Sequence, residues 1–129
     1  MQAIDVISGE VVGEAIRIHR ELGPGLLESV YETVLAGSLQ RRGFKVARQV
    51  PVAIEYDGMT FDAAFRIDLL VDDRLIVEIK AVEQLNKVHA KQVLTYLRLM
   101  KQPVGLLLNF SGLTMAEGIR RLVNNYAPE

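Results

Sequence analysis

The 129-residue chain contains no cysteine and no tryptophan, and it has only four prolines. Without cysteine it cannot form disulfides or thiolate metal sites, and this composition suits a reducing compartment, so we expect a cytoplasmic protein. No apolar run approaches the ~20 residues of a membrane-spanning helix, and no basic and apolar leader follows Met1, so we expect no membrane association. The net charge of −1 and the pI of about 6.1 argue against a strong stand-alone nucleic-acid binder but leave room for a local basic groove.

Repeats, linkers and low-complexity segments are also missing from the sequence. What is present is a composition typical of globular proteins, with 50% hydrophobic and 24% charged residues. A chain of this length has room for one hydrophobic core. We therefore expect a single domain over residues 1–129.

The hydrophobic pattern predicts an α/β fold with the element order ααβββαβα, in which helices flank a mixed central sheet. Apolar residues at helical spacing alternate along the chain with β-branched stretches and turn signals. The predicted helices cover residues 4–22, about 26–42, about 87–101 with Asn86 as N-cap, and about 114–124. The predicted strands cover residues 44–56, a return strand from 59 with an interruption near 62–64, then 65–71, 75–80 and 104–110.

A tight β-hairpin near the middle of the chain is the most informative element. Two segments rich in isoleucine, leucine and valine, 65–71 and 75–80, flank the polar loop Asp72–Arg74. Pairing Val71 with Leu75 places apolar side chains together on one face. A slip of one residue would mix charges into that face, so a three-residue loop is favoured.

The same register gathers charged side chains on the other face of the hairpin. Asp68 lies opposite Glu78, and Lys80 follows two residues later on the same face. Two adjacent carboxylates repel each other unless a cation lies between them, and hard oxygen ligands suit Mg²⁺ or Mn²⁺. The carbonyl of Ile79 offers a further ligand, and Lys80 offers a positive charge for a bound water or for a transition state. The competing interpretation is a solvated strand face with weak ion pairs.

Two predicted helices carry further candidate residues. Glu28 lies in the first turn of its helix, where the macrodipole alone accounts for a carboxylate, and Tyr31 one turn later is expected to be a core aromatic residue with its hydroxyl at the surface. On the later helix His89, Gln92 and Tyr96 share one side, facing the sheet or a substrate. For His89 a surface or capping role is favoured over metal ligation.

These residues together resemble the GxxExxY family of small bacterial and archaeal proteins, whose defining motif matches Gly25-x-x-Glu28-x-x-Tyr31. The resemblance extends from about Ile7 to Val123. It implies membership of the PD-(D/E)xK nuclease superfamily and a restriction-endonuclease-like fold. Further matching pieces are Leu22-Gly23-Pro24-Gly25, Asp68 with Glu78-Ile79-Lys80, Gln92-x-x-x-Tyr96-Leu97, and Gly105-Leu106-Leu107-Leu108-Asn109-Phe110.

The resemblance also implies roles for individual residues. Asp68 and Glu78 are the expected metal ligands, Lys80 is the expected catalytic lysine, and Glu28 is the helical acidic residue that completes such sites. The pattern Gln92-x-x-x-Tyr96 resembles the signature of the RecB-like branch, in which these residues line the site beside the lysine. Ile67 stands where many members have a proline before the aspartate. The implied metal ligands are thus Glu28, Asp68, Glu78 and the carbonyl of Ile79.

We therefore expect a Mg²⁺- or Mn²⁺-dependent domain that hydrolyses phosphodiester bonds in nucleic acid, DNA or RNA, through a metal-activated water. The alternative is a catalytically idle nuclease-fold module that binds protein or nucleic acid. A third interpretation is a structural domain whose carboxylates form plain ion pairs. A homodimer is expected, through the first helix or an exposed sheet edge, because a C2 pair of sites is the simplest way to cut two strands.

Overall fold

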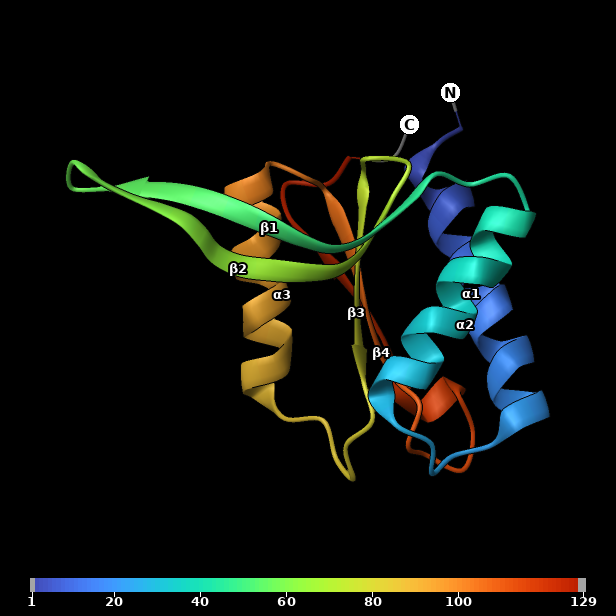
Figure 1. Ribbon diagram of the computed structural model, residues 1–129. Coiled ribbons are helices and arrows are strands. Elements are labelled where there is room, and N and C mark those ends of the chain that lie inside the picture. The colour runs from blue at the N-terminus through green and yellow to red at the C-terminus, as the bar shows by residue number, and fades with distance from the viewer. Residues whose placement is uncertain (1, 128–129) are drawn as a thin grey trace.

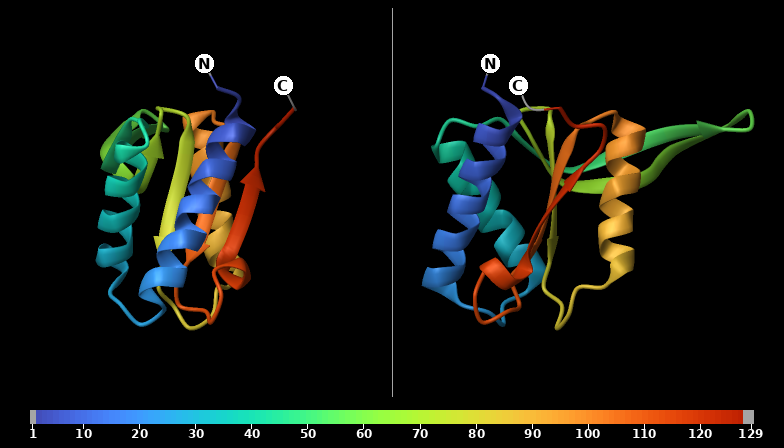
Figure 2. Two further views of the ribbon diagram at one scale, coloured as in Figure 1. Left: turned by 90° about the vertical axis from the view of Figure 1, so that its right-hand side faces the viewer. Right: turned by 180° about the vertical axis from the view of Figure 1, so that it is seen from behind.

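Five strands form one mixed sheet with helices on both faces in the computed structural model, which describes residues 2–127. Figures 1 and 2 show α1 and α2 on one face and α3 on the other. The strands lie in chain order across the sheet, and within the described range the β3–β4 pair is parallel while the other pairs are antiparallel. No helix in this range has the length and apolar character needed to cross a membrane. The elements are α1 (Ile4–Leu22), α2 (Glu28–Arg41), β1 (Val46–Tyr56), β2 (Met59–Val71), β3 (Leu75–Lys80), α3 (Lys87–Met100), β4 (Val104–Asn109), the 3₁₀ helix η1 (Ala116–Gly118) and β5 (Ile119–Val123).

Each helical layer encloses its own apolar core against the sheet, and strand β3 contributes to both. Val77 and Ile79 pack in the core under α1 and α2, whereas Ile76 packs in the core under α3. Successive side chains of a strand point to opposite faces, so Glu78 and Lys80 lie on the α3 face together with Ile76. The apolar residues on either side of Glu78 thus fix the face on which its carboxyl group emerges.

The predicted α/β fold is confirmed, and the predicted register of the hairpin is confirmed from the loop as far as Leu69 and Val77. Beyond that point the predicted pairing is not formed, because Ile67 packs in the core under α3 whereas Ile79 packs in the core under α1 and α2. Leu69 pairs with Val77, and Val71 pairs with Leu75 across the loop Asp72–Arg74. Both aspartates of this loop adopt the left-handed conformation, with φ of 52° and 59°. Aspartate tolerates this conformation better than most residues, which suits it to a tight hairpin turn.

The prediction of a final helix at residues 114–124 is wrong. Only η1 is helical there, and the chain continues as β5, in which Ile119 pairs with Leu108 and Leu122 pairs with Gly105. The free edge of the buried strand β4 offers hydrogen bonds that outweigh the weak helical spacing of the apolar residues. Gly118 permits the close approach, because a Cβ atom there would lie 2.0 Å from the Asn109 carbonyl oxygen.

Smaller differences concern two boundaries. Helix α2 begins at Glu28, two residues later than predicted, because the preceding loop is held in a different conformation. Strand β2 runs without a break through the predicted interruption at 62–64, and the irregularity takes the form of a register shift in its pairing with Val52 and Ile54 of β1. A bulge of this kind lets a long hairpin bend without ending either strand.

The N-terminus of α3 is capped as the sequence predicts. The Asn86 side-chain oxygen accepts hydrogen bonds from the backbone N–H groups of Val88 and His89, and His89 Nδ1 accepts one from the Asn86 N–H at 3.2 Å. This reciprocal arrangement is a capping box. His89 therefore has a capping role, as favoured over metal ligation.

The hairpin of β1 and β2 extends well past α3 as a two-stranded arm, which is seen at the left of Figure 1 and at the right in the rear view of Figure 2. Tyr56, Met59 and Phe61 lie near its tip with exposed fractions of 71%, 52% and 46%. A two-stranded ribbon gains little stability by itself in water. The arm is thus an exposed apolar feature next to the edge of the sheet.

A buried carboxylate joins the two N-terminal helices. Glu14 of α1 is only 6% exposed and accepts hydrogen bonds from Arg17, from Arg42 at 2.9 Å, and from the Ser38 hydroxyl. The Arg17 guanidinium lowers the pKa of the Glu14 carboxyl below its ordinary value, against the opposing effect of burial. This network fixes α2 against α1 and hence the position from which α2 approaches the sheet.

Candidate functional site

The predicted pair of carboxylates lies where the regular pairing of β2 with β3 ends. The registered β2–β3 pairs stop at Leu69 and Val77, one residue before Asp68 and Glu78. Asp68 Oδ2 accepts a hydrogen bond from the Ile79 N–H at 2.8 Å, and Glu78 Oε1 accepts one from the Asp68 N–H at 3.2 Å. Each carboxyl group therefore takes a main-chain donor of the opposite strand, and the two side chains are locked together as the strands separate.

A main-chain acceptor of the buried residue Ile79 is directed toward the same place. The Ile79 N–H points toward β2, because it donates to Asp68. The N–H and C=O groups of one strand residue point toward the same neighbouring strand. The Ile79 carbonyl therefore faces the opening beside Asp68, in keeping with its prediction as a ligand.

The electrostatics of this pair are dominated by the burial of Glu78, which is 4% exposed. Burial, followed by the negative charge of Asp68, raises the pKa of Glu78 to about 9, and the positive charge of Lys80 opposes this only weakly. Near pH 7 the buried Glu78 carboxyl group thus carries a proton. A cation arriving between the two carboxyl groups would displace that proton.

The other predicted residues on this face differ in how closely they join the pair. Lys80 is half-buried on the same face as Glu78. Tyr96 is buried in the α3 core and stacks on Phe65 with ring centroids 4.1 Å apart. Burial, and then the charges of Glu78 and Asp68, raise the pKa of the Tyr96 hydroxyl, which places that hydroxyl in the field of the pair. Gln92 is exposed one turn earlier on α3, and no side-chain hydrogen bond or ion pair among the described residues joins it to the pair.

The predicted motif Gly25-x-x-Glu28-x-x-Tyr31 positions the start of α2 relative to the site. Tyr31 is fully buried, and its hydroxyl donates to the Gly23 carbonyl at 2.6 Å and accepts from the Leu26 N–H at 3.2 Å. Contrary to prediction, this hydroxyl lies inside the protein, where it pins the α1–α2 loop. Gly25 has a φ of 102°, which an L side chain rarely adopts. The loop so fixed sets the start of α2 and with it the position of Glu28.

Glu28 reaches the end of β3 rather than the carboxylate pair itself. Its side chain is exposed, and Oε1 accepts a hydrogen bond from the Ala81 N–H at 3.2 Å, directly after Lys80. The prediction that Glu28 approaches the site from the N-terminal helical layer agrees with this placement. Its role as a metal ligand stays a prediction.

Sequence reasoning missed two polar residues that touch the site. Gln49 Nε2 lies 3.2 Å from Asp68 Oδ1 and 2.7 Å from Glu32 Oε1, so its amide group bridges the carboxylates of Asp68 and Glu32. Glu32 is 8% exposed and also accepts a hydrogen bond from Arg48 at 3.0 Å. Glu32 lies four residues after Glu28 on the same side of α2, a spacing that could have identified it.

The donor atoms at the site suit a hard divalent cation. The Asp68 and Glu78 carboxylates and the Ile79 carbonyl are all oxygen donors, and Mg²⁺ is commonly held by one or two carboxylates together with water and substrate phosphate. Among the described residues, no three histidine, cysteine, aspartate or glutamate side chains are arranged to hold a metal by themselves. The residues therefore fit a metal that is bound partly by substrate and water rather than one caged by protein.

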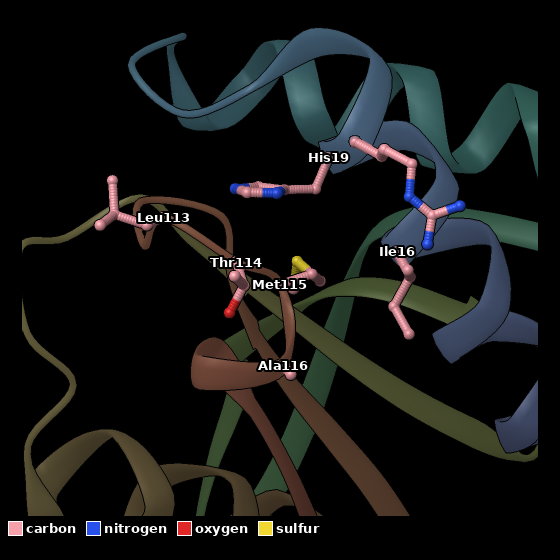
Figure 3. Close-up of a pocket in the computed structure, with 7 residues that line it drawn as sticks. Ile16, His19, Leu113, Thr114, Met115 and Ala116 are labelled. Carbon is pink, nitrogen blue, oxygen red and sulfur yellow. The ribbon is translucent and has the colours of Figure 1, made fainter.

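A separate pocket of about 320 Å³ lies on the other side of the sheet, between α1 and the segment after β4 (Figure 3). Its walls include Ile16, His19, Leu113 and Met115. His19 Nε2 lies 2.9 Å from the Gly112 carbonyl oxygen, and no carboxylate lines this pocket. It lacks the carboxylate ligands that favour a hard divalent cation and contains none of the predicted site residues.

Comparison with known protein families gives a match over most of the chain. A sequence model described as the PD-(D/E)XK nuclease superfamily matches residues 5–122, which is most of the chain. The matched span includes every predicted site residue. No curated protein and no solved structure matches the chain.

Proposed function

We propose that this chain, which belongs to the PD-(D/E)XK nuclease superfamily, hydrolyses phosphodiester bonds of nucleic acid with Mg²⁺ or Mn²⁺ as cofactor. The observation that carries the proposal is the interlocked pair of Asp68 and Glu78, with Lys80 on the same face, where β2 separates from β3. An inert descendant of such a fold has no physical need to keep a buried carboxyl group next to a second carboxylate, since that arrangement is costly.

The roles of the residues follow from their positions. Asp68, Glu78 and the Ile79 carbonyl would hold the metal, with Glu28 at the end of β3 reaching it through water or substrate. Bound Mg²⁺ would supply a water of lowered pKa and would neutralise charge on the phosphate. Lys80 orients that water or balances transition-state charge as a point charge.

Residues of α3 serve the substrate in this proposal. Tyr96 closes the apolar side of the site through its stack on Phe65 and keeps its hydroxyl protonated beside the pair. Gln92, exposed one turn earlier, would orient the substrate or the lysine. Lys87, Lys91 and Arg98 are spaced at four and seven residues on exposed positions of α3. They supply positive charge for phosphate groups, although the whole chain carries a net charge of −1.

The finer family assignment and the oligomeric state belong to the same proposal. The motif of Gly25, Glu28 and Tyr31 supports membership of the GxxExxY family, because all three residues have structural tasks in placing α2. For cutting two strands we propose a homodimer formed through the exposed arm. The segment 55–62 of the arm carries three acidic and no basic residues, so its apolar tip suits a protein surface better than nucleic acid.

A nuclease assay tests the proposal. Wild type and Lys80→Ala are incubated with single-stranded, duplex and branched DNA and RNA, each with Mg²⁺, with Mn²⁺ and with chelator. We expect metal-dependent cleavage of at least one substrate by wild type and a large loss in Lys80→Ala. Cleavage of none of them by wild type, or equal cleavage by both proteins, contradicts the proposal.

A catalytically idle binding module is the second candidate. The observation in its favour is that, in residues 2–127, no three acidic or histidine side chains form a metal site without help. For such a module we expect nucleic acid or a protein partner to bind equally well with and without Mg²⁺. Substrate binding that requires Mg²⁺ contradicts it.

A further inference from the structure

Gln49 occupies an unusual place in strand β1. The registered β1–β2 pairs include Arg48 with Leu69 and Val50 with Ile67, but the pair between them, Gln49 with Asp68, is skipped. Gln49 itself has a φ of 49°, in the left-handed region. A residue other than glycine adopts this conformation only when its surroundings hold it there, and such positions are frequent at functional sites.

The side-chain contacts of Gln49 explain what holds it. Its amide nitrogen carries two protons, and its two partners are Glu32 Oε1 at 2.7 Å and Asp68 Oδ1 at 3.2 Å. Glu32 is in turn held by Arg48 at 3.0 Å, and Arg48 also donates to Thr33 Oγ1 at 2.8 Å. A chain of polar contacts thus runs from α2 through the amide of Gln49 to the Asp68 carboxylate.

We infer that Gln49 is a positioning residue that, anchored by Glu32, fixes the Asp68 carboxylate for metal binding. This inference rests on the proposed function. Both oxygens of Asp68 are oriented by donors, Oδ2 by the Ile79 N–H and Oδ1 by Gln49. Each carboxylate oxygen has two lone pairs, so both keep one free for a cation.

The chemistry of an amide suits this task better than that of a charged residue. A lysine or arginine at this position would neutralise Asp68 and would repel an arriving cation. The neutral amide of Gln49 orients the carboxylate without removing its charge. Glu32 makes the arrangement specific, because it takes the second amide proton and so sets the rotation of the amide group. Outer-shell partners of this kind commonly change metal affinity by 10–100-fold.

The test measures Mg²⁺ binding by calorimetry on the full chain, together with metal-free melting curves. Gln49→Met preserves the length of the side chain and removes both donors, and Gln49→Asn retains the amide but shortens its reach. Gln102→Met is the matched control, because the Gln102 amide donates only weakly, at 3.4 Å, to the carbonyl of Asp73 in the β2–β3 loop. We expect both Gln49 variants to bind Mg²⁺ at least ~10-fold more weakly than wild type and the control to bind as wild type does.

The outcomes separate the inference from the function on which it rests. Wild-type affinity in both Gln49 variants overturns the inference and leaves the proposed nuclease intact. A lowered metal-free melting temperature with unchanged Mg²⁺ affinity assigns Gln49 a purely structural role and also overturns it. If wild type binds no Mg²⁺, the proposed function fails and the inference fails with it. Should Gln49→Met not fold, Gln49→Asn decides, because asparagine tolerates the left-handed conformation.

Discussion

Replacing Glu78 by glutamine should stabilise the metal-free protein at neutral pH. Glu78 is 4% exposed, and burial, then the charge of Asp68, raises its pKa from the ordinary 4.5 to about 9. The folded protein therefore holds a proton at pH 7 that the unfolded chain releases. Glutamine has the same shape, stays neutral at every pH, and retains an oxygen that can accept the hydrogen bond from the Asp68 N–H.

The sign and size of the effect follow from linkage. A raised carboxyl pKa favours the folded state below pH 4.5, and this contribution is lost progressively as the pH rises from 4.5 to about 9. Each pH unit in this window lowers the free energy of unfolding by about 1.4 kcal/mol. From pH 4.5 to pH 7 the loss amounts to roughly 3 kcal/mol in the wild type. Glu78→Gln removes this titration. The free energy of unfolding of the variant should therefore equal that of wild type near pH 4 and exceed it by roughly 3 kcal/mol at pH 7.

Urea unfolding at pH 5, 7 and 8.5 in the presence of chelator measures the effect. Glu83→Gln is the control, since it makes the same chemical change at an exposed position after β3. We expect the difference between Glu78→Gln and wild type to widen with pH and that of the control to stay constant. Parallel pH profiles of wild type and Glu78→Gln, or a less stable variant at pH 7, would refute the assignment of a buried, protonated Glu78.

Four further outcomes are expected. Lys80→Ala should bind Mg²⁺ as tightly as wild type or more tightly, because a positive charge is removed, while cleavage measured by gel assay falls by ~10² or more. Asp68→Ala should abolish the rise in melting temperature that Mg²⁺ causes and leave the metal-free fold intact. Glu14→Gln should lower the free energy of unfolding by about 1–2 kcal/mol in urea titrations near neutral pH, whereas the exposed Glu21→Gln should change it by less than ~0.5 kcal/mol. Phe61→Asp at the tip of the arm should convert a dimer into a monomer in sedimentation experiments.

For each of these expectations a specific result would contradict it. Equal cleavage by Lys80→Ala removes the catalytic role of that lysine, and a wild-type metal shift in Asp68→Ala moves the metal elsewhere. The pKa of Glu14 is lowered, so its contribution should be lost as the pH falls through the folded-state pKa, and a constant contribution at acid pH contradicts the network. A wild type that sediments as a monomer at high micromolar concentration eliminates the dimer and leaves the chemistry untouched.

The central hairpin was predictable because several local rules agree there. The apolar alternation, the polar loop and the cost of placing charge on the apolar face all select the pairing of Val71 with Leu75, and the structure has it. The same agreement identified α1 as Ile4–Leu22 and the cap of α3 at Asn86. What the sequence could not supply is the detail of pairing beyond Leu69, where carboxyl groups replace main-chain acceptors.

The prediction of a helix at residues 114–124 failed for the opposite reason, since the local signals of this segment are weak and contradictory. Apolar residues at 115, 119 and 122 have helical spacing, whereas the β-branched Ile119 and Val123 favour a strand. The segment forms a strand because it pairs with the edge of β4, and that edge exists only in the assembled sheet. Sequence periodicity carries no information about such an edge until the sheet is assembled.

The residues of the candidate site likewise fall into those that the sequence could identify and those that it could not. Asp68, Glu78 and Lys80 could be placed near one another because they lie within one hairpin, whose register up to Leu69 and Val77 leads directly to them. Glu32 and Gln49 could not, because their relation to Asp68 depends on the packing of α2 beside β1, across 17 or more residues of chain. A left-handed conformation at a glutamine also has no sequence signal of its own.

The site is held together by the same groups that a metal would use. Asp68 Oδ2 and Glu78 Oε1 each accept a hydrogen bond from a main-chain N–H group of the opposite strand. The proton on Glu78 removes the negative charge that a cation would otherwise balance. Metal binding must therefore release that proton, so affinity for Mg²⁺ should rise about tenfold per pH unit below pH 9 and level off above it. The proton on Glu78 thus competes directly with the cofactor, and the pH dependence of Mg²⁺ binding reports on the same carboxyl group as the stability of Glu78→Gln.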